Sequence, residues 1–240
     1  MTQQGFFITG TDTGSGKTAV TAGLLACFRN MGYKPGVMKP IETGVSPDCS
    51  SPANSDARFL MEANQETLAL SQVCPYQIKT PAAPYQAARL DQREIDIGLI
   101  LDAFSHIRET RNPMLVEGIG GLMVPICEDY SVVDLVRDTQ LPLIVVSPLR
   151  LGALNHTLLT LKVAEMEGLL IAGVILNNLE NRADDPVMAG MAELIQTFGK
   201  VPVLGQFPYL EELSSESIQE NLSEIMNGLH LDTQTNWAFP

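Results

Sequence analysis

The sequence predicts an α/β fold in which a mostly parallel sheet is covered by helices on both faces. Short apolar runs alternate along the chain with segments whose apolar residues recur at helical spacing, which is typical of buried parallel sheets. In addition, the first apolar run leads into a glycine-rich turn that ends in Lys17 and Thr18, as in loops that bind phosphate groups. These observations favour one domain of the P-loop NTPase type, residues 1–240.

Six runs are expected to be strands because each is short and almost continuously apolar. In chain order they are residues 6–9, 36–39, 114–117, 143–147, 171–177 and 203–207. In open parallel sheets, ligands bind beyond the carboxyl ends of the strands. The residues that directly follow each run are therefore the candidates for function.

The expected helices lie between these runs. The first, residues 19–29, has apolar residues at helical spacing from Val20 to Phe28. The second begins near Ser55, whose hydroxyl can cap a helix, and a proline-rich connection over residues 75–84 comes later. The remaining expected helices are residues 95–110, 132–137, 154–167, 186–198 and 217–226.

The phosphate-binding loop runs from Gly10 to Thr18. Gly14 and Gly16 allow backbone N–H groups to turn toward a ligand. Lys17 can reach the β- and γ-phosphates of a nucleotide, and Thr18 offers a hydroxyl to Mg²⁺. Five residues rather than four separate Gly10 from Gly16, so the loop is one residue longer than the common form. The loop predicts binding of a nucleoside triphosphate.

Charged residues end two other expected strands. Lys39 can direct its ammonium group at a transferring phosphoryl group or at a developing carboxylate charge. A surface lysine at a turn would give the same sequence pattern. Glu117 ends a four-residue apolar run and fits a carboxylate that holds Mg²⁺, whereas a strand-capping glutamate is the plain alternative. Gly118 and Gly120 after it allow close approach of a ligand. Asp56 alone is most simply a partner for a helix dipole.

Two further segments follow expected strands. Asn177 and Asn178 carry paired amides that can read adenine edges or simply form a turn. Gly152 to Asn155 open an expected helix, where free N–H groups can receive a carboxylate. His156 is expected to pack or cap rather than to act as a catalyst.

The composition narrows the class of protein. The net charge of −13 disfavours binding to nucleic acid or to anionic membranes, so any phosphate site must be a local positive island. Four scattered cysteines without a Cys-x-x-Cys pair indicate reduced thiols and no zinc site. No secretion signal and no apolar run long enough to span a bilayer is seen. We therefore expect a cytoplasmic protein.

Several of these motifs together resemble the dethiobiotin synthetase family. The resemblance covers nearly the whole chain, and its motifs occur in the family's order. They are Gly10 to Thr13 with Gly16 to Thr18, Lys39-Pro40 with Thr43-Gly44, Asn54 to Asp56, Val116 to Gly118 with Gly120-Gly121, Leu151-Gly152 with Asn155-His156, Asn177, and Gly205 with Pro208.

The resemblance implies a reaction and its participants. The family closes a ureido ring on 7,8-diaminononanoate with CO₂, ATP and Mg²⁺, through a carbamate that ATP phosphorylates, and its members are homodimers. Lys17 and Lys39 would face the γ-phosphate and the carbamate, with Thr11 and Thr43 at the diamine or carbamate. Thr18, Asp56 and Glu117 would hold Mg²⁺. The nucleotide would meet Thr13, Gly14, Ser15, Gly16, Lys17, Thr18, Asp56, Glu117, Gly118, Gly120, Asn177, Asn178, Pro208, Tyr209 and Leu210, and the substrate carboxylate would meet Gly152, Ala153, Leu154 and Asn155 of the partner subunit.

The sequence departs from the family pattern at three positions. Gly14 stands where some relatives carry Glu, and Asn178 replaces a frequent Asp beside the adenine, which weakens the expectation of strict ATP preference. Thr43 replaces Ser and keeps the hydroxyl.

Two other functions occur on the same kind of scaffold. A cobyrinate-type amide synthetase would need a glutaminase domain for which the chain has no room. A dimeric ATPase switch of the partitioning kind would carry a second lysine early in the loop, and residues 11–15 contain none.

Overall fold

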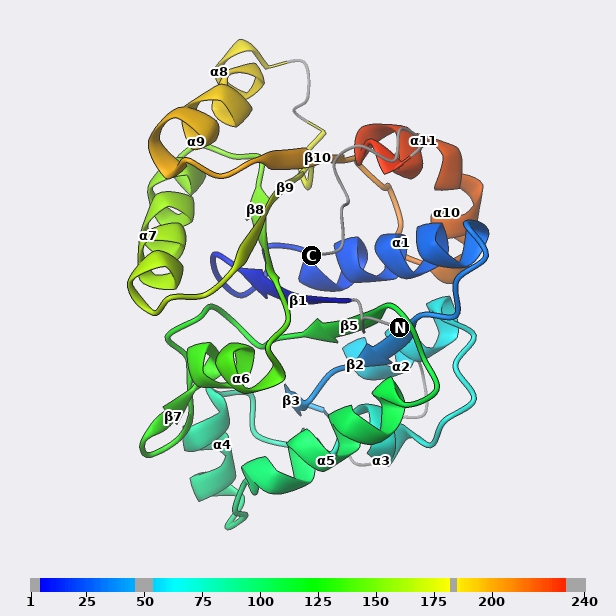
Figure 1. Cartoon of the computed structure of the whole chain (residues 1–240), viewed down its shortest axis with the longest axis vertical. Helices are drawn as coiled ribbons and strands as arrows, with labels where there is room; N and C mark the ends of the chain where they lie inside the picture. Colours follow the sequence, from blue (N-terminus) through cyan, green and yellow to red (C-terminus); the bar gives the residue numbers. More distant parts are fainter. Residues whose placement is uncertain (1–4, 46–53, 182–184, 232–240) are drawn as a thin grey trace.

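The computed structural model describes residues 5–45, 54–181 and 185–231. Its centre is one sheet of six strands in the order β10-β9-β8-β1-β5-β2, and every neighbouring pair is parallel. Figure 1 shows the sheet running from β10 at the top down to β2. The strands are β1 (Gly5–Gly10), β2 (Gly36–Met38), β5 (Met114–Glu117), β8 (Leu143–Pro148), β9 (Ile171–Asn177) and β10 (Val203–Phe207).

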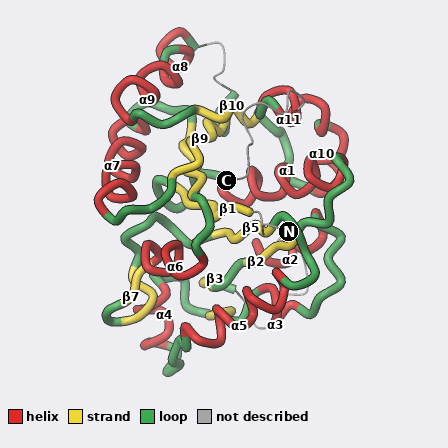
Figure 2. Tube along the Cα trace, viewed as in Figure 1, coloured by secondary structure: helices red, strands yellow, loops and turns green. Residues whose placement is uncertain are grey.

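Helices cover both faces of this sheet, because alternate strand residues point to opposite sides. Phe6 and Ile8 of β1 pack into one apolar core and Phe7 into the other. The first core is formed with α1 (Lys17–Asn30), α2 (Asp56–Ala63), α10 (Ser215–Glu220) and α11 (Leu222–Gly228). The second is formed with α5 (Ile97–Arg108), α6 (Val132–Thr139), α7 (Ala153–Met166) and α9 (Met191–Gly199). The predicted fold class is therefore confirmed, as the tube in Figure 2 also shows.

The structure also contains short elements that the sequence analysis did not predict. The two residues after β2, Lys39 and Pro40, lead into β3 (Ile41–Thr43), which pairs in parallel with β4 (Tyr76–Ile78). A small antiparallel pair joins β6 (Pro125–Cys127) to β7 (Tyr130–Ser131). The helices α3 (Leu70–Val73) and α4 (Pro84–Leu90) flank the proline-rich segment. Elements of two to seven residues are too short to show a clear period in the sequence.

Two expected helices are each broken into two. The segment expected over residues 186–198 forms α8 (Pro186–Ala189) and α9, with Gly190 between them. The segment over residues 217–226 forms α10 and α11, and Asn221 ends the first and begins the second. Both breaks fall at residues with poor helix propensity. Their apolar spacing continues across the break, which is why the sequence predicted one helix.

The remaining elements match their predictions to within a few residues at each end. Cys27, Cys74 and Cys127 are free thiols, while Cys49, residues 1–4 and the tail after residue 231 lie outside the described residues. Within the described part of the chain, no helix is long and apolar enough to cross a membrane. For the site, the main consequence of the fold is that β1, β5 and β9 end at the same edge of the sheet, at Gly10, Glu117 and Asn177.

Candidate functional site

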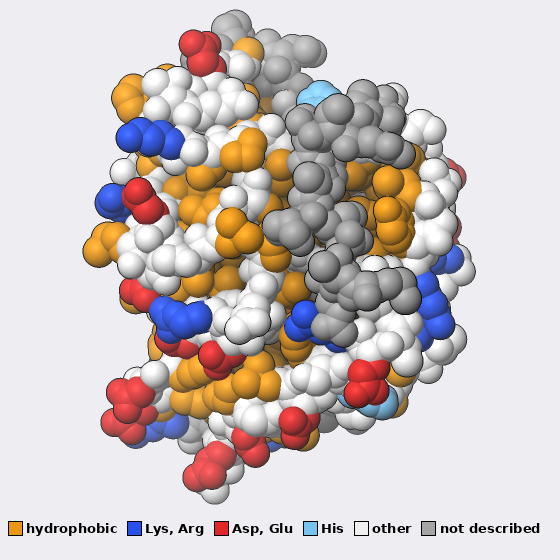
Figure 3. Space-filling model, in the orientation of Figure 1, with side chains coloured by type: hydrophobic (Ala, Val, Ile, Leu, Met, Phe, Trp, Pro, Cys, Tyr) orange, Lys and Arg blue, Asp and Glu red, His pale blue; other side chains and the backbone are white. Residues whose placement is uncertain are grey.

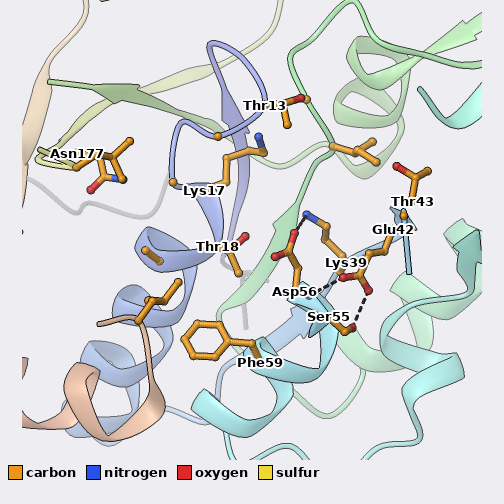
Figure 4. A pocket seen from close by; sticks show the side chains of 18 of the residues that line it. Thr13, Lys17, Thr18, Lys39, Glu42, Thr43, Ser55, Asp56, Phe59 and Asn177 are labelled. Atoms are coloured by element: carbon orange, nitrogen blue, oxygen red, sulfur yellow. Dashed lines mark hydrogen bonds and ion pairs between the residues drawn. The ribbon is translucent and has the colours of Figure 1, made fainter. Parts of the chain in front are cut away.

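A cleft of about 960 Å³ lies beyond this edge of the sheet. The phosphate-binding loop, the segment from Lys39 to Val45 and the start of α2 supply its polar walls. Apolar walls come from residues 81–84 on one side and from Phe207, Leu210 and Leu213 on another. Figure 4 shows Lys17, Lys39 and Asp56 approaching this cleft from three different segments of the chain.

The phosphate-binding loop is held in shape by glycines and by Asn177. Gly16 is the N-cap of α1 and has a φ of 83°, a left-handed conformation that favours glycine. A Cβ on Gly16 would lie 1.9 Å from the Nδ2 atom of Asn177. That amide donates a hydrogen bond of 3.0 Å to the carbonyl oxygen of Ser15. The end of β9 thus braces the loop at the end of β1.

Lys17 is nearly buried at the bottom of the cleft. Only 7% of the residue is exposed, and its Nζ donates a hydrogen bond of 3.2 Å to the carbonyl oxygen of Asp12. Burial, with the charge of Lys39 as a smaller cause, lowers the pKa of Lys17 to about 8. An anion beside this ammonium group would oppose both effects. The loop is therefore electrostatically suited to a phosphate group.

Lys39 lies at the centre of a buried ion cluster. Its ammonium group donates to Oε1 of Glu117 and lies 3.2 Å from Oδ2 of Asp56. The Lys39 and Glu117 side chains are 3% and 0% exposed. Burial alone would lower the pKa of Lys39, but the two carboxylates outweigh it and raise that pKa above its ordinary value. A buried charge is tolerated only when it is paired in this way.

The same cluster provides oxygen atoms of the kind that Mg²⁺ prefers. The hydroxyl of Thr18 donates a hydrogen bond of 3.0 Å to Oε1 of Glu117, so the two side chains lie together. Oε2 of Glu117 is buried and has no hydrogen-bond partner. Among the described residues, no group of three or more His, Cys, Asp or Glu side chains is arranged so that it could hold a metal ion. Two carboxylates and a hydroxyl nevertheless suit Mg²⁺, which usually binds few protein ligands together with phosphate oxygens and water.

Glu42 is a site residue to which the sequence analysis assigned no role. It is 5% exposed and lies on β3, directly beside the start of α2. Its carboxylate accepts hydrogen bonds from the hydroxyl of Ser55 and the backbone N–H of Asp56. The sequence gives no clear sign of this contact, because nothing in it predicts β3.

The predicted nucleotide residues are mostly brought together. The residues from that prediction that line the cleft are Thr13, Gly14, Gly16, Lys17, Thr18, Asp56, Gly120, Asn177, Asn178, Pro208, Tyr209 and Leu210. The other three predicted nucleotide residues, Ser15, Glu117 and Gly118, are buried and are not among the lining residues. Phe59 and Leu179 also line the cleft and were not predicted.

The predicted substrate residues are divided between two places. Lys39 and Thr43 line the cleft, whereas Thr11 and residues 152–155 are not among its lining residues. Gly152 is the exposed N-cap of α7 with a φ of 88°. Within one chain, the start of α7 is therefore separate from the cleft.

The sequence is similar to known proteins over most of its length. A family model described as "AAA domain" matches residues 4–217. The curated ATP-dependent dethiobiotin synthetase BioD of Bacillus subtilis (strain 168) is 38% identical over 93% of this chain and 98% of its own length. The chain belongs to the dethiobiotin synthetase family. The BioD protein of Thermodesulfovibrio yellowstonii is likewise 38% identical, over 90% of this chain and 93% of its own.

Solved structures that resemble this dethiobiotin synthetase family member agree with the fold. A ParA family ATPase from Chlorobium tepidum TLS aligns with a TM-score of 0.51 at 17% identity, covering 98% of this chain and 95% of its own. The MinC:MinD cell division protein complex of Aquifex aeolicus gives a TM-score of 0.55 at 16% identity, covering 93% and 96%. At these identities the likeness shows the fold alone, and the P-loop NTPase architecture is confirmed.

Proposed function

We propose that this protein makes dethiobiotin by closing a ureido ring on 7,8-diaminononanoate with CO₂, ATP and Mg²⁺. The observation that carries the proposal is the meeting of Lys17, Lys39 and Asp56 in one cleft beside a phosphate-binding loop, with Glu117 buried against Lys39, in a chain of the dethiobiotin synthetase family. We also propose that residues 1–240 form one synthetase domain, which works in the cytoplasm.

The reaction needs a protein that aligns charged groups. One amine of the substrate adds to CO₂ and loses a proton, which gives a carbamate. A carbamate oxygen then attacks the γ-phosphorus of ATP, and ADP leaves. The second amine attacks the carbonyl carbon of the mixed anhydride, inorganic phosphate leaves, and the ring is closed. Lys17 and Lys39 would neutralise the charge that builds up on the phosphoryl group and the carbamate.

Thr18, Asp56 and Glu117 would hold Mg²⁺ at this site. When bound, the ion would neutralise the phosphate oxygens during transfer. We expect excess EDTA to stop the formation of product, and added Mg²⁺ to restore it. Product formation that persists without a divalent metal would contradict the roles of these residues.

The remaining substrate contacts follow the family pattern. Asn177, Asn178 and Pro208 to Leu210 would border the adenine, with Thr11 and Thr43 at the diamine or carbamate. In a homodimer, Gly152 to Asn155 of the partner subunit would receive the substrate carboxylate through free N–H groups. This assignment is supported by the exposed position of that helix start outside its own chain's cleft.

The test is a direct assay. The protein is incubated with 7,8-diaminononanoate, bicarbonate, Mg²⁺ and a panel of nucleotides, and the cyclic urea is detected by its mass. ATP is expected to support product formation. If no nucleotide yields the cyclic urea and the protein instead dimerises only on binding ATP, the function is that of an ATPase switch.

A further inference from the structure

We infer that Glu42 is a positioning residue for this reaction, because it holds the start of α2 so that Asp56 faces Lys39 and the proposed magnesium site. The inference rests on the proposed function and adds a residue that the family resemblance does not assign. Figure 4 shows Glu42 joined to both Ser55 and Asp56, with Lys39 at the carboxylate of Asp56.

Both oxygens of the Glu42 carboxylate bind the first residues of α2. Oε2 accepts a hydrogen bond of 2.8 Å from the hydroxyl of Ser55, and Oε1 accepts one from the backbone N–H of Asp56. Hydrogen bonds to a carboxylate are stronger than those between neutral groups. Glu42 therefore fixes the backbone of the residue whose own side chain reaches the ion cluster.

The position of Asp56 matters because its carboxylate is the less restrained of the two carboxylates that are proposed to hold Mg²⁺. Its side chain is 47% exposed, whereas that of Glu117 is 0% exposed. Its Oδ2 lies 3.2 Å from the Lys39 ammonium group. A shift of about 1 Å in such a group costs on the order of 100-fold in rate when charges must be aligned. The hydrogen bond from the backbone N–H of Asp56 to Glu42 limits that shift.

Glu42 also links Asp56 to the strand that follows Lys39. Glu42 belongs to β3, three residues after Lys39, and is the register partner of Gln77 on β4. The side-chain amide of Gln77 donates a bond of 3.3 Å to Oε2 of Glu42. The β3–β4 pair therefore supports both the lysine and the helix start.

A purely structural role for Glu42 explains less. Ser55 already caps α2, because its hydroxyl accepts a hydrogen bond from the backbone N–H of Arg58. Burying a carboxylate to assist an existing cap carries a desolvation penalty, and a neutral side chain would avoid it. The negative charge of Glu42 is explained if it keeps the carboxylate of Asp56 beside the ammonium group of Lys39.

The test compares Glu42→Gln and Glu42→Ala with a matched control. Asp134 makes a similar contact at the start of α6, where its carboxylate accepts from the backbone N–H and the hydroxyl of Ser131, each at 2.8 Å. It is not among the residues that line the cleft. Asp134→Asn therefore weakens a comparable helix start away from the site.

The readout is the Mg²⁺ concentration at which a non-hydrolysable ATP analogue binds half-maximally, measured without turnover. Changing residues that orient metal ligands typically weakens metal affinity about 10- to 100-fold. We expect Glu42→Gln to raise this concentration about tenfold and Glu42→Ala to raise it further. Asp134→Asn should lower the melting temperature and leave the Mg²⁺ dependence unchanged.

An unchanged Mg²⁺ dependence in Glu42→Gln would overturn the inference, as would an equal shift in Asp134→Asn. If Glu42→Ala does not fold, Glu42→Gln and Ser55→Ala decide, because Ser55→Ala keeps the bond to the Asp56 N–H and should shift the dependence less. A wild-type protein that forms no cyclic urea would refute the proposed function, while the binding assay would still test Glu42.

Discussion

At the scale of single residues, Lys39 and the carboxylates of Glu117 and Asp56 form an ion cluster that is costly to bury. The protein keeps a cation that is 3% exposed beside a carboxylate that is 0% exposed. Function explains such a buried pair better than stability does, because apolar residues of similar volume often stabilise a protein as well or better. The ammonium group pairs with both of the carboxylates that are proposed to hold Mg²⁺ and offsets part of their charge.

Replacing Lys39 by Met tests this account. The change leaves Glu117 and Asp56 without their cation, and removing one partner of a buried pair costs about 3–5 kcal/mol. We expect a loss of that order in urea unfolding with EDTA and a smaller loss with Mg²⁺. Turnover should fall strongly while binding of ATP is mostly retained. Unchanged single-turnover rates would remove Lys39 from its proposed role.

Two glycines of the phosphate-binding loop give a matched pair of variants. Gly14 and Gly16 both have positive φ, 77° and 83°, but an added Cβ meets nothing within 4 Å at Gly14. At Gly16 it would collide with the Asn177 amide, which braces the loop. Gly14→Ala should therefore cost about 1–2 kcal/mol from backbone strain alone. Gly16→Ala should cost more and should also abolish nucleotide binding, measured by titration calorimetry. Equal effects of the two changes would contradict the bracing role of Asn177.

At this scale, the sequence predicted the residues with distinctive chemistry and missed those defined by local packing. Lys17, Thr18 and Asp56 were expected beside one edge of the sheet, and they line one cleft. Glu42 was not assigned a role, because its contacts depend on β3 and on the start of α2 together. The bond from Asn177 to Ser15 also joins residues far apart in the chain, and no local pattern encodes such a contact.

At the scale of elements, a buried ion pair fastens the turn after α2 to the segment before β5. Nη2 and Nε of Arg111 lie 2.6 Å and 3.1 Å from the two carboxylate oxygens of Glu66. Burial would raise the pKa of Glu66, but hydrogen bonds from Arg111 and from the backbone of Thr67, with the charge of Arg111, outweigh it and lower that pKa. The pair therefore links folding to pH.

The pH dependence of this pair has a defined sign. A carboxylate with a depressed pKa in the folded protein contributes stability above its unfolded pKa, and loses it as the pH falls through the folded value. Glu66→Gln removes this titration. We expect the difference in unfolding free energy between wild type and variant to be greatest near neutral pH and to shrink below the ordinary pKa of 4.5. Urea unfolding over a pH series measures it, and a constant difference would contradict the argument.

The sequence predicted best the elements whose apolar residues form a continuous run or recur at helical spacing. Both faces of β1 are buried and α1 packs directly on it, so the apolar run and the helical spacing were both visible. The breaks at Gly190 and Asn221 were not predicted, because apolar residues recur on both sides of each. Both residues have poor helix propensity, but one such residue is tolerated within a helical pattern, so the sequence does not show that the helix breaks there.

At the scale of the whole molecule, the surface combines strong net negative charge with exposed apolar side chains. The net charge is −13, and the two lysines of the cleft, Lys17 and Lys39, are buried, with Lys39 paired to two carboxylates. Figure 3 shows hydrophobic side chains exposed between scattered acidic and basic groups on one face. On and just before α7, Leu151, Leu159 and Met166 are 81%, 58% and 74% exposed. If the start of α7 serves the cleft of a partner subunit, Leu151 and Leu159 would lie closest to the contact between subunits, because they are within two turns of that helix start.

Leu159→Glu tests this arrangement, with Leu99→Glu on α5 as the control. Both leucines are well exposed, at 58% and 50%, so neither change disturbs the core. A charge inside an apolar interface opposes association. We therefore expect Leu159→Glu to lower the mass in sedimentation from twice the 26.1 kDa of one chain toward that of a monomer. Its KM for the diamine should rise while nucleotide binding is retained, because on the proposed arrangement only the substrate carboxylate would lose a contact with the partner subunit. Leu99→Glu should stay dimeric with an unchanged KM. A Leu159→Glu protein that is monomeric yet has a normal KM would show that each cleft is complete within one chain.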